Sequence, residues 1–323
     1  MTNNPLNLDE AVELAGLWWL PDEPSKQIPG ILQYDGEGRS SLSLIGAFED
    51  RIFSDPASGF TYYLEGARTW DVIHGVAEQR EVTLLGCVPT KSKRTLLARV
   101  NSLDTQTISA TIVIVGVHVS GEEDAAFAAA EVSVEDLTHW AASSVFEDSI
   151  GIHGRKFDGT GTVSVKPVET QTATVNGTEY SLVHTHTLPF FDRRKSRTVG
   201  RMRDTASIRI RRAEPFALRA ALDAASLIQD LIALATHRAA GVIWLRLEIV
   251  GTESVLPNGQ PLPRRFANVL YSPVALGKHD AKAVDPDRVF FTCDALPFEE
   301  VLPRWCEAHG RLQAATNMIL GLR

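Results

Sequence analysis

In the N-terminal half of the sequence, clusters of Gly, Pro and Asp recur roughly every 8 to 14 residues and separate short runs rich in Val, Ile, Thr and Tyr. This pattern predicts strands joined by tight turns. In the N-terminal half, the expected strands are residues 16–20, 30–34, 41–45, 69–74 and 81–88. Residues 111–119 read TIVIVGVHV, and an unbroken β-branched run is typical of a strand buried on both faces. We therefore expect this run to be a central strand.

The second half adds further strands and two helices. We expect strands at 161–168, 180–187, 206–212 and 242–250, and mixed strand and short helix over 124–142. From residue 215 to 237, apolar residues recur mostly at three- and four-residue spacing, which predicts a helix that Pro215 opens. Residues 297–322 predict a second helix, bent near Pro303. The predicted fold class is α+β and mainly β, with two β-sandwich-like lobes, a long helix after residue 214 and a C-terminal helix.

The length of 323 residues suits two domains, at roughly 100 to 200 residues per domain. We expect a first β-rich lobe at 1–145 and a second β lobe at 146–296 that contains the helix 215–238. Residues 297–323 are expected to form a helical connector.

The C-terminal helix carries a broad apolar stripe. Its members are Phe298, Val301, Leu302, Trp305, Leu312, Ala315, Ile319 and Leu320. A stripe of this width needs a covering partner, which could be the β lobes, a domain beyond residue 323 or another subunit. Trp18 and Trp19 are expected on opposite faces of one strand, one in the core and one at a contact between lobes or partners. The candidate partner or interdomain residues are Trp18, Trp305, Leu312 and Ile319.

Charge is distributed unevenly along the chain. The net charge is -8, but residues 193–212 hold nine Lys and Arg against one acid, a local balance of +8, so the rest of the chain stands at -16. Such asymmetry is typical of a polyanion site, and Arg suits phosphate because it can bind two oxygens. The alternative is a flexible solvated loop whose arginines lie beside carboxylates. The candidate RNA or polyanion-binding residues are Arg193, Arg194, Lys195, Arg197, Arg201, Arg203, Arg209 and Arg211. Because no aromatic residue lies between 193 and 212, contact is expected mostly with the RNA backbone.

A composition of 44% hydrophobic and 22% charged residues is that of an ordinary globular protein. The cysteines Cys87, Cys293 and Cys306 are odd in number and widely spaced, so we expect buried free thiols in a reducing compartment. The first ten residues lack an export signal, and no stretch approaches the roughly 18 apolar residues of a membrane span. We therefore expect a cytoplasmic protein without a membrane partner.

Two groups of residues could suggest catalysis. Arg304 and His309 have the R-x4-H spacing of HEPN ribonucleases, but five residues on a helix place them about 140° apart, so we assign no catalytic residue. His184 and His186 share a strand face and could bind a metal with a third ligand such as His153 or Asp192. No third ligand stands at a recognisable spacing, and nucleotide, zinc-protease and hydrolase-elbow motifs are lacking from the sequence. We predict no metal and no cofactor.

Several segments resemble the N-terminal domain of the ApeA-type abortive-infection proteins. They are residues 16–48, residues 72–87 with VIHGVAEQREVTLLGC, the LTHW segment at 137–140, the helix with LIALATHRAAG, and FEEVLPRWCEAHGRL at 298–312. The resemblance implies a bacterial anti-phage protein in which a β-rich domain precedes a helical HEPN ribonuclease domain that cleaves RNA. The HEPN nuclease motif has no matching position in this sequence, so we expect a chain without that domain.

Three hypotheses about function follow. The first is a non-enzymatic sensing and regulatory module that recognises a phage trigger and controls a HEPN ribonuclease, with homodimerisation left open. The second is an RNA-binding module that uses the basic segment 193–212 to contact the backbone of a tRNA-like substrate. The third is a metal-dependent hydrolase that acts through His184 and His186.

Overall fold

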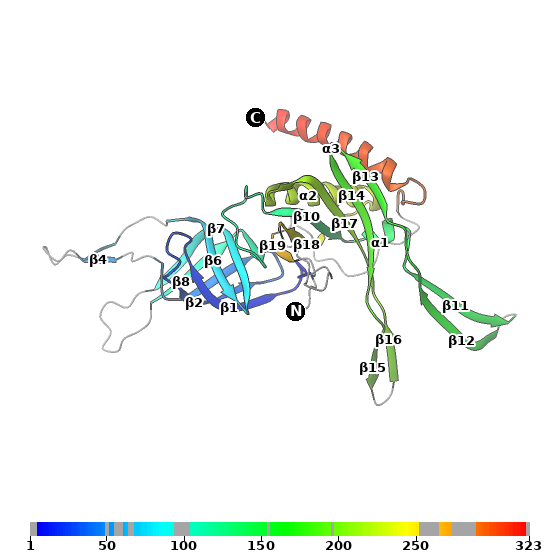
Figure 1. The fold of residues 1–323 in the computed structure, drawn as a ribbon, viewed down its shortest axis with the longest axis horizontal. Helices are drawn as coiled ribbons and strands as arrows, with labels where there is room; N and C mark the ends of the chain where they lie inside the picture. The colour runs from blue at the N-terminus through cyan, green and yellow to red at the C-terminus, as the bar shows by residue number, and fades with distance from the viewer. Residues whose placement is uncertain are drawn as a thin grey trace. The chain divides into compact units, whose positions relative to one another are not determined.

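The computed structural model describes residues 5–48, 52–54, 61–63, 68–93, 104–153, 156–194, 197–251, 265–272 and 289–320 (Figure 1). It is mainly β, with about 50% strand and 19% helix, which confirms the predicted class. The chain forms two compact units. The first contains residues 1–128, 215–220 and 243–275, and the second contains 129–214, 221–242 and 276–323. This division differs from the expected boundaries after residues 145 and 296, because each unit is assembled from three separate stretches of sequence.

The first unit is built on a closed barrel. Its strands are β1 (Val12–Trp19), β2 (Ile28–Tyr34), β3 (Ser40–Ile45), β6 (Trp70–Ala77), β7 (Arg80–Lys93) and β8 (Thr105–Ala110). They pair in the order β7-β6-β1-β2-β3-β8, and β8 pairs again with β7, so the sheet closes on itself. The closure makes this lobe a barrel and not the expected sandwich. A separate two-stranded ribbon joins β4 (Ile52–Ser54) and β5 (Thr61–Tyr63).

Three more strands extend the sheet of the first unit from β7. They are β9 (Ile112–Val115), β19 (Phe266–Tyr271) and β18 (Val242–Ile249). All four residues of β9 are buried, and the strand lies between β7 and β19. This confirms the prediction of a central strand, although the strand is shorter than the β-branched run.

Trp18 is a core residue of the barrel. Its side chain is fully buried, and its indole Nε1 donates a hydrogen bond to the carbonyl oxygen of Gly30 at 3.2 Å. Trp19 points to the other face, where its ring meets the rings of His74 and His118 edge-on. The assignment of Trp18 as a partner contact is therefore wrong, because this face of β1 turns into the barrel.

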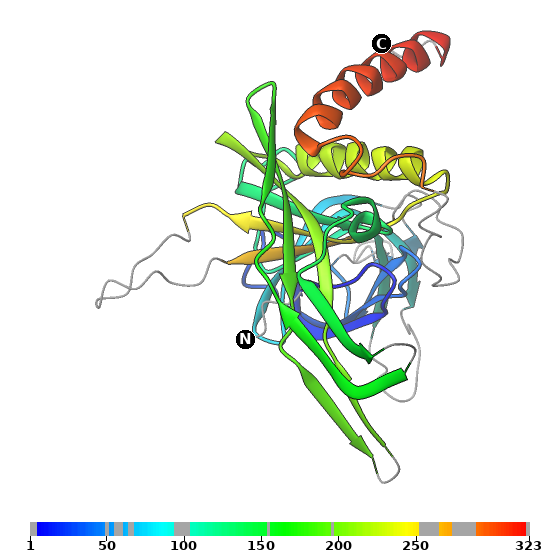
Figure 2. The same ribbon diagram turned by 90° about the vertical axis from the view of Figure 1, so that its right-hand side faces the viewer.

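The described residues of the second unit form a sheet, three helices and two further ribbons, whose arrangement Figures 1 and 2 show. The sheet order is β13 (Gln171–Val175), β14 (Thr178–His186), β17 (Asp204–Phe216) and β10 (Phe127–Val134). The ribbons pair β11 (Phe146–His153) with β12 (Lys156–Val165), and β15 (Phe190–Arg194) with β16 (Arg197–Arg201). The helices are α1 (Leu137–Trp140), α2 (Leu218–Thr236) and α3 (Phe298–Leu320).

The sequence predicted α2 well but placed its start too early. The strand β17 continues through Pro215 to Phe216, so the helix begins at Leu218. The periodic apolar face is buried as expected, including Ala221, Ala225, Ile228, Leu231, Ile232 and Ala235. No helix among the described residues is long and apolar enough to cross a membrane.

The three cysteines are free thiols, and Cys87 and Cys293 are buried as predicted. Burial raises the pKa of each of these two thiols to about 12. Cys306 on α3 is half-buried, and burial raises its pKa as well.

Candidate functional site

The basic segment forms the end of one long two-stranded ribbon. β14 and β17 pair from Thr178 and Arg212 to His186 and Asp204. Thr187 and Arg203 then exchange hydrogen bonds of 2.9 Å, and the ribbon continues as the β15–β16 hairpin (Figure 2). The segment is therefore largely ordered as strand, which contradicts the alternative of a flexible loop.

The hairpin exposes aromatic and cationic side chains together. Phe190 pairs with Arg201 and is 68% exposed, while Phe191 pairs with Gly200 and is 59% exposed. Arg193, Arg201 and Arg203 are exposed as well. The sequence did not reveal this combination, because Phe190 and Phe191 precede the basic segment and only the antiparallel register brings Phe190 opposite Arg201.

The remaining basic candidates are placed differently. Arg194 and Arg197 pair across the end of the hairpin, and Lys195 lies outside the described residues. Arg209 and Arg211 alternate with the buried Ile208 and Ile210 on β17. Arg209 follows Arg201 by eight residues, which in nearly extended chain at about 3.3 Å per residue span up to about 26 Å. The candidates therefore line a ribbon and do not form one compact cluster.

The helix α3 is covered over only part of its length. Phe298, Val301 and Leu302 are buried in the second unit, and Trp305 Nε1 donates to the carbonyl oxygen of Leu227 on α2 at 2.9 Å. Every residue from 310 to 320 is exposed. The exposed apolar side chains are Leu312 at 63%, Met318 at 80%, Ile319 at 84% and Leu320 at 64%.

Arg304 and His309 bind separate partners on and beside α3. Arg304 Nη2 lies 3.2 Å from Glu300 Oε2 on the same helix. His309 Nε2 lies 3.0 Å from Asp230 Oδ2 on α2. Their spacing in the sequence does not bring them into one site.

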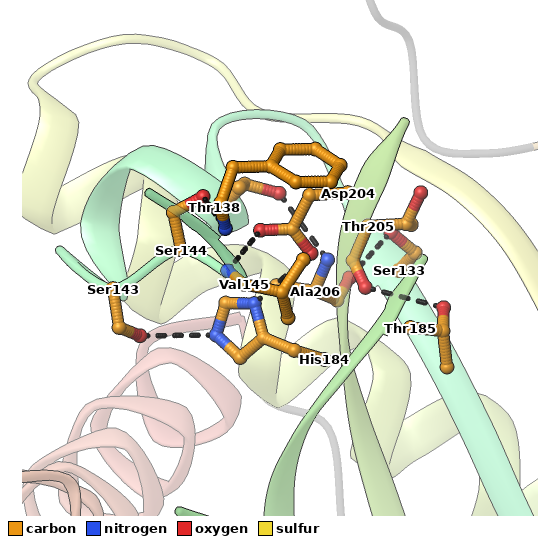
Figure 3. A network of polar contacts seen from close by, with 11 residues as sticks. Ser133, Thr138, Ser143, Ser144, Val145, His184, Thr185, Asp204, Thr205 and Ala206 are labelled. Carbon is orange, nitrogen blue, oxygen red and sulfur yellow. Dashed lines mark hydrogen bonds and ion pairs between the residues drawn. The ribbon is translucent and has the colours of Figure 1, made fainter. Parts of the chain in front are cut away.

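His184 lies in a polar network with Ser143 and Asp204 (Figure 3). Its Nδ1 is 3.2 Å from Asp204 Oδ1, and its Nε2 is 3.0 Å from Ser143 Oγ. The side chains of His184 and Asp204 are only 3% and 6% exposed, whereas His186 is exposed. No group of three potential metal ligands occurs among the described residues. Both ring nitrogens of His184 are engaged by Ser143 and Asp204, which argues against the metal-dependent hydrolase.

Comparison with known families identifies the chain. The family model described as ApeA N-terminal domain 1 matches residues 13–305. The chain belongs to this family. No curated protein and no solved structure matches it.

The match spans both units of the structure. It supports a module of anti-phage defence. As an N-terminal domain it implies a C-terminal effector domain in the full protein.

Proposed function

We propose that this ApeA N-terminal domain is the sensing and regulatory module of an anti-phage protein. It recognises a phage-derived trigger and controls a C-terminal RNA-cleaving domain. Family membership supports the defence role. The observation that carries the regulatory role is the set of exposed apolar residues in the second half of α3, at Leu312, Met318, Ile319 and Leu320, of which Leu312 and Ile319 share a face.

The physical argument rests on how α3 is anchored. The apolar side chains of its first turn are buried in the second unit, and Trp305 and His309 hydrogen-bond to α2. The helix is thereby held at one end while the other end presents apolar surface to water. Exposed large apolar side chains gathered in this way mark contacts with other protein surfaces. A conformational change in this domain, caused by binding of the trigger, can be transmitted along the anchored helix α3 to an effector domain that binds its exposed end.

The experiment compares RNA cleavage by the C-terminal domain alone, by the two domains joined, and by the joined protein in phage-infected extract. We expect the joined protein to cleave slowly until infected extract is added. Equal cleavage in all three samples would contradict control by this domain. RNA cleavage by residues 1–323 alone that is lost on Arg304→Ala or His309→Ala substitution would contradict the assignment of cleavage to the C-terminal domain.

A second candidate function is RNA binding by the β15–β16 hairpin. The observation that favours it is the exposure of Phe190 and Phe191 beside Arg193, Arg201 and Arg203. Residues 188–203 contain six Lys and Arg and one acid, a balance of +5. Arginines attract the phosphates, and exposed aromatic rings can stack on unpaired bases. The hairpin thus offers both elements of a single-strand RNA surface.

A further inference from the structure

We propose that Ser143, His184 and Asp204 form an acyl-hydrolase site, a separate activity from the regulatory role proposed above. In this site Ser143 is the nucleophile, His184 is the general base, and Asp204 is the positioning residue. The substrate class is a small neutral or cationic ester. All three residues belong to the second unit.

The order of donors and acceptors matches that of an activated serine. A carboxylate only accepts hydrogen bonds, so Asp204 Oδ1 fixes the His184 proton on Nδ1. Nε2 is then left as an acceptor, and it lies 3.0 Å from the hydroxyl oxygen of Ser143. The same relay of hydroxyl, imidazole and carboxylate recurs on unrelated folds and is recognised by its geometry.

Asp204 and His184 are held in place by the sheet and the loop. His184 pairs with Ala206 and Asp204 pairs with His186, so the two functional side chains are diagonal neighbours on β14 and β17. Asp204 Oδ2 also accepts a hydrogen bond from the backbone N–H of Val145 at 3.2 Å. A base and a carboxylate that are almost fully buried keep one orientation and exclude water from their contact.

Ser143 stands in a loop that is fixed on both sides. On one side, Thr138 Oγ1 on α1 accepts a hydrogen bond from the Ala206 backbone N–H. On the other side, Val145 is bound to Asp204 (Figure 3). The residue before the serine, Ala142, has a φ of 52°. Left-handed backbone is costly for a residue with a Cβ, and such strain is concentrated at functional sites.

The nucleophile faces a pocket. Ser143 and Ser144 line a pocket of about 500 Å³ together with Thr138, His139, Ala142, Val289, Thr292 and Asp294. This volume is in the range of small-molecule sites. Among the described residues that line it, Asp294 is the one carboxylate and there is neither Lys nor Arg, which favours a neutral or cationic substrate. We assign the backbone N–H groups of Ser143 and Ser144 as the donors to the oxyanion, since both residues line the pocket and no described residue accepts a hydrogen bond from either group.

The reaction balances with water as the only co-reactant. Ser143 Oγ attacks the ester carbonyl carbon while its proton passes to His184 Nε2. The tetrahedral intermediate collapses, the bond to the alcohol oxygen breaks, and His184 returns the proton to the departing alcohol. Water then adds to the acyl-serine with His184 as base, and the carboxylic acid leaves as Ser143 regains its proton.

The alternative is that the three side chains only tie the loop to the sheet. A structural tie and a nucleophile predict different reactivity toward a fluorophosphonate, because only an activated serine displaces the fluoride. We expect wild-type protein to gain one adduct, located on Ser143 by peptide mass spectrometry, and to hydrolyse p-nitrophenyl acetate with saturation.

Substitutions of Ser143, of Asp204 and of a control serine distinguish a catalytic site from a structural contact. Ser143→Ala is expected to lose the adduct and to hydrolyse the ester at the rate of buffer alone. Ser149→Ala, the matched control at an exposed serine on β11 outside the pocket, should retain both. Asp204→Asn is expected to lower kcat with little change in KM. Folded wild-type protein without an adduct at Ser143, or Ser143→Ala protein as active as wild type, would overturn the proposal.

Discussion

The indole ring of Trp18 lies against the backbone of Gly75 so closely that a Cβ at this glycine would stand 2.3 Å from the ring. The two residues are paired partners on β1 and β6, and the ring also reaches Gly30 on β2. The barrel therefore fits its largest buried side chain by omitting side chains from both neighbouring strands.

We predict that Gly75→Ala destabilises the first unit. The added methyl group cannot fit without displacing Trp18, and overpacking of this kind costs about 1–3 kcal/mol. Urea unfolding followed by tryptophan fluorescence measures the change. Gly121→Ala is the matched control, because no atom lies within 4 Å of its Cβ position. Equal stability of the two variants would mean that the ring moves aside freely.

We predict that acid weakens the first unit through His74. Burial lowers the pKa of His74 below its ordinary 6.5; a hydrogen bond to the Val119 carbonyl raises it and the neighbouring His118 lowers it. The rings of His74 and His118 are stacked at 4.5 Å. The unfolded chain therefore binds the proton more readily than the folded one. The contribution of His74 to the unfolding free energy is fully present above pH 6.5 and is lost as the pH falls through 6.5 toward the lower folded pKa.

His74→Gln tests this assignment, because the amide can still donate to the Val119 carbonyl but does not titrate. Urea unfolding at pH 7.5, 6.5 and 5.5 should show a smaller loss of unfolding free energy in the variant than in the parent protein. An unchanged pH slope would assign the acid sensitivity to other groups.

Local sequence predicted local structure well. The alternation of Ile208 and Ile210 with Arg209 and Arg211 was enough to place β17, because side chains alternate between faces of any strand. The β-branched run at 112–115 likewise identified the central strand β9. Barrel closure was not predictable, since the pairing of β7 with β8 depends on where the sheet curls and not on either strand alone.

The sequence indicated only one member of the network of Ser143, His184 and Asp204. His184 was a candidate metal ligand together with His186, because residues two apart share a strand face. The structure separates them: His184 is buried beside Asp204, whereas His186 is exposed. Ser143 precedes His184 by 41 residues and reaches it only through the fold. The sequence signal for this network is an acid and a histidine that lie diagonally across β14 and β17. That signal can be recognised only when the register of the two strands is known.

We predict that the β15–β16 hairpin binds single-stranded RNA with two separable contributions. Arg193→Ala and Arg201→Ala should each make the dependence of log K on log salt shallower by about 0.7, since each removes one phosphate contact. Phe190→Ala should weaken binding by about 1–3 kcal/mol and leave the salt slope unchanged, because stacking is lost. Fluorescence anisotropy across a salt series measures both.

Arg304→Ala is the matched control for charge, because this arginine is exposed on α3 and forms its ion pair with Glu300. Its binding curve should coincide with that of the parent protein. If Arg211→Ala weakens binding as much as Arg201→Ala does, the RNA follows β17 as well as the hairpin. If Phe190→Ala has no effect at any salt concentration, stacking on this ring makes no contribution.

We predict that Leu312→Asp and Ile319→Asp weaken the contact that we propose between α3 and a C-terminal effector domain. Both side chains are largely exposed, so the isolated chain should keep its unfolding free energy within about 0.5 kcal/mol. In the complex, each substitution places a charge in an apolar contact, and the loss of a central anchor weakens binding by about 2 kcal/mol or more. Titration calorimetry against the separately purified effector domain measures the affinity.

Val163→Asp is the matched control, because Val163 is 60% exposed on β12 and lies outside α3. Similar losses in all three variants would indicate a non-specific effect of charge, and unchanged affinity in the α3 variants would place the effector contact elsewhere.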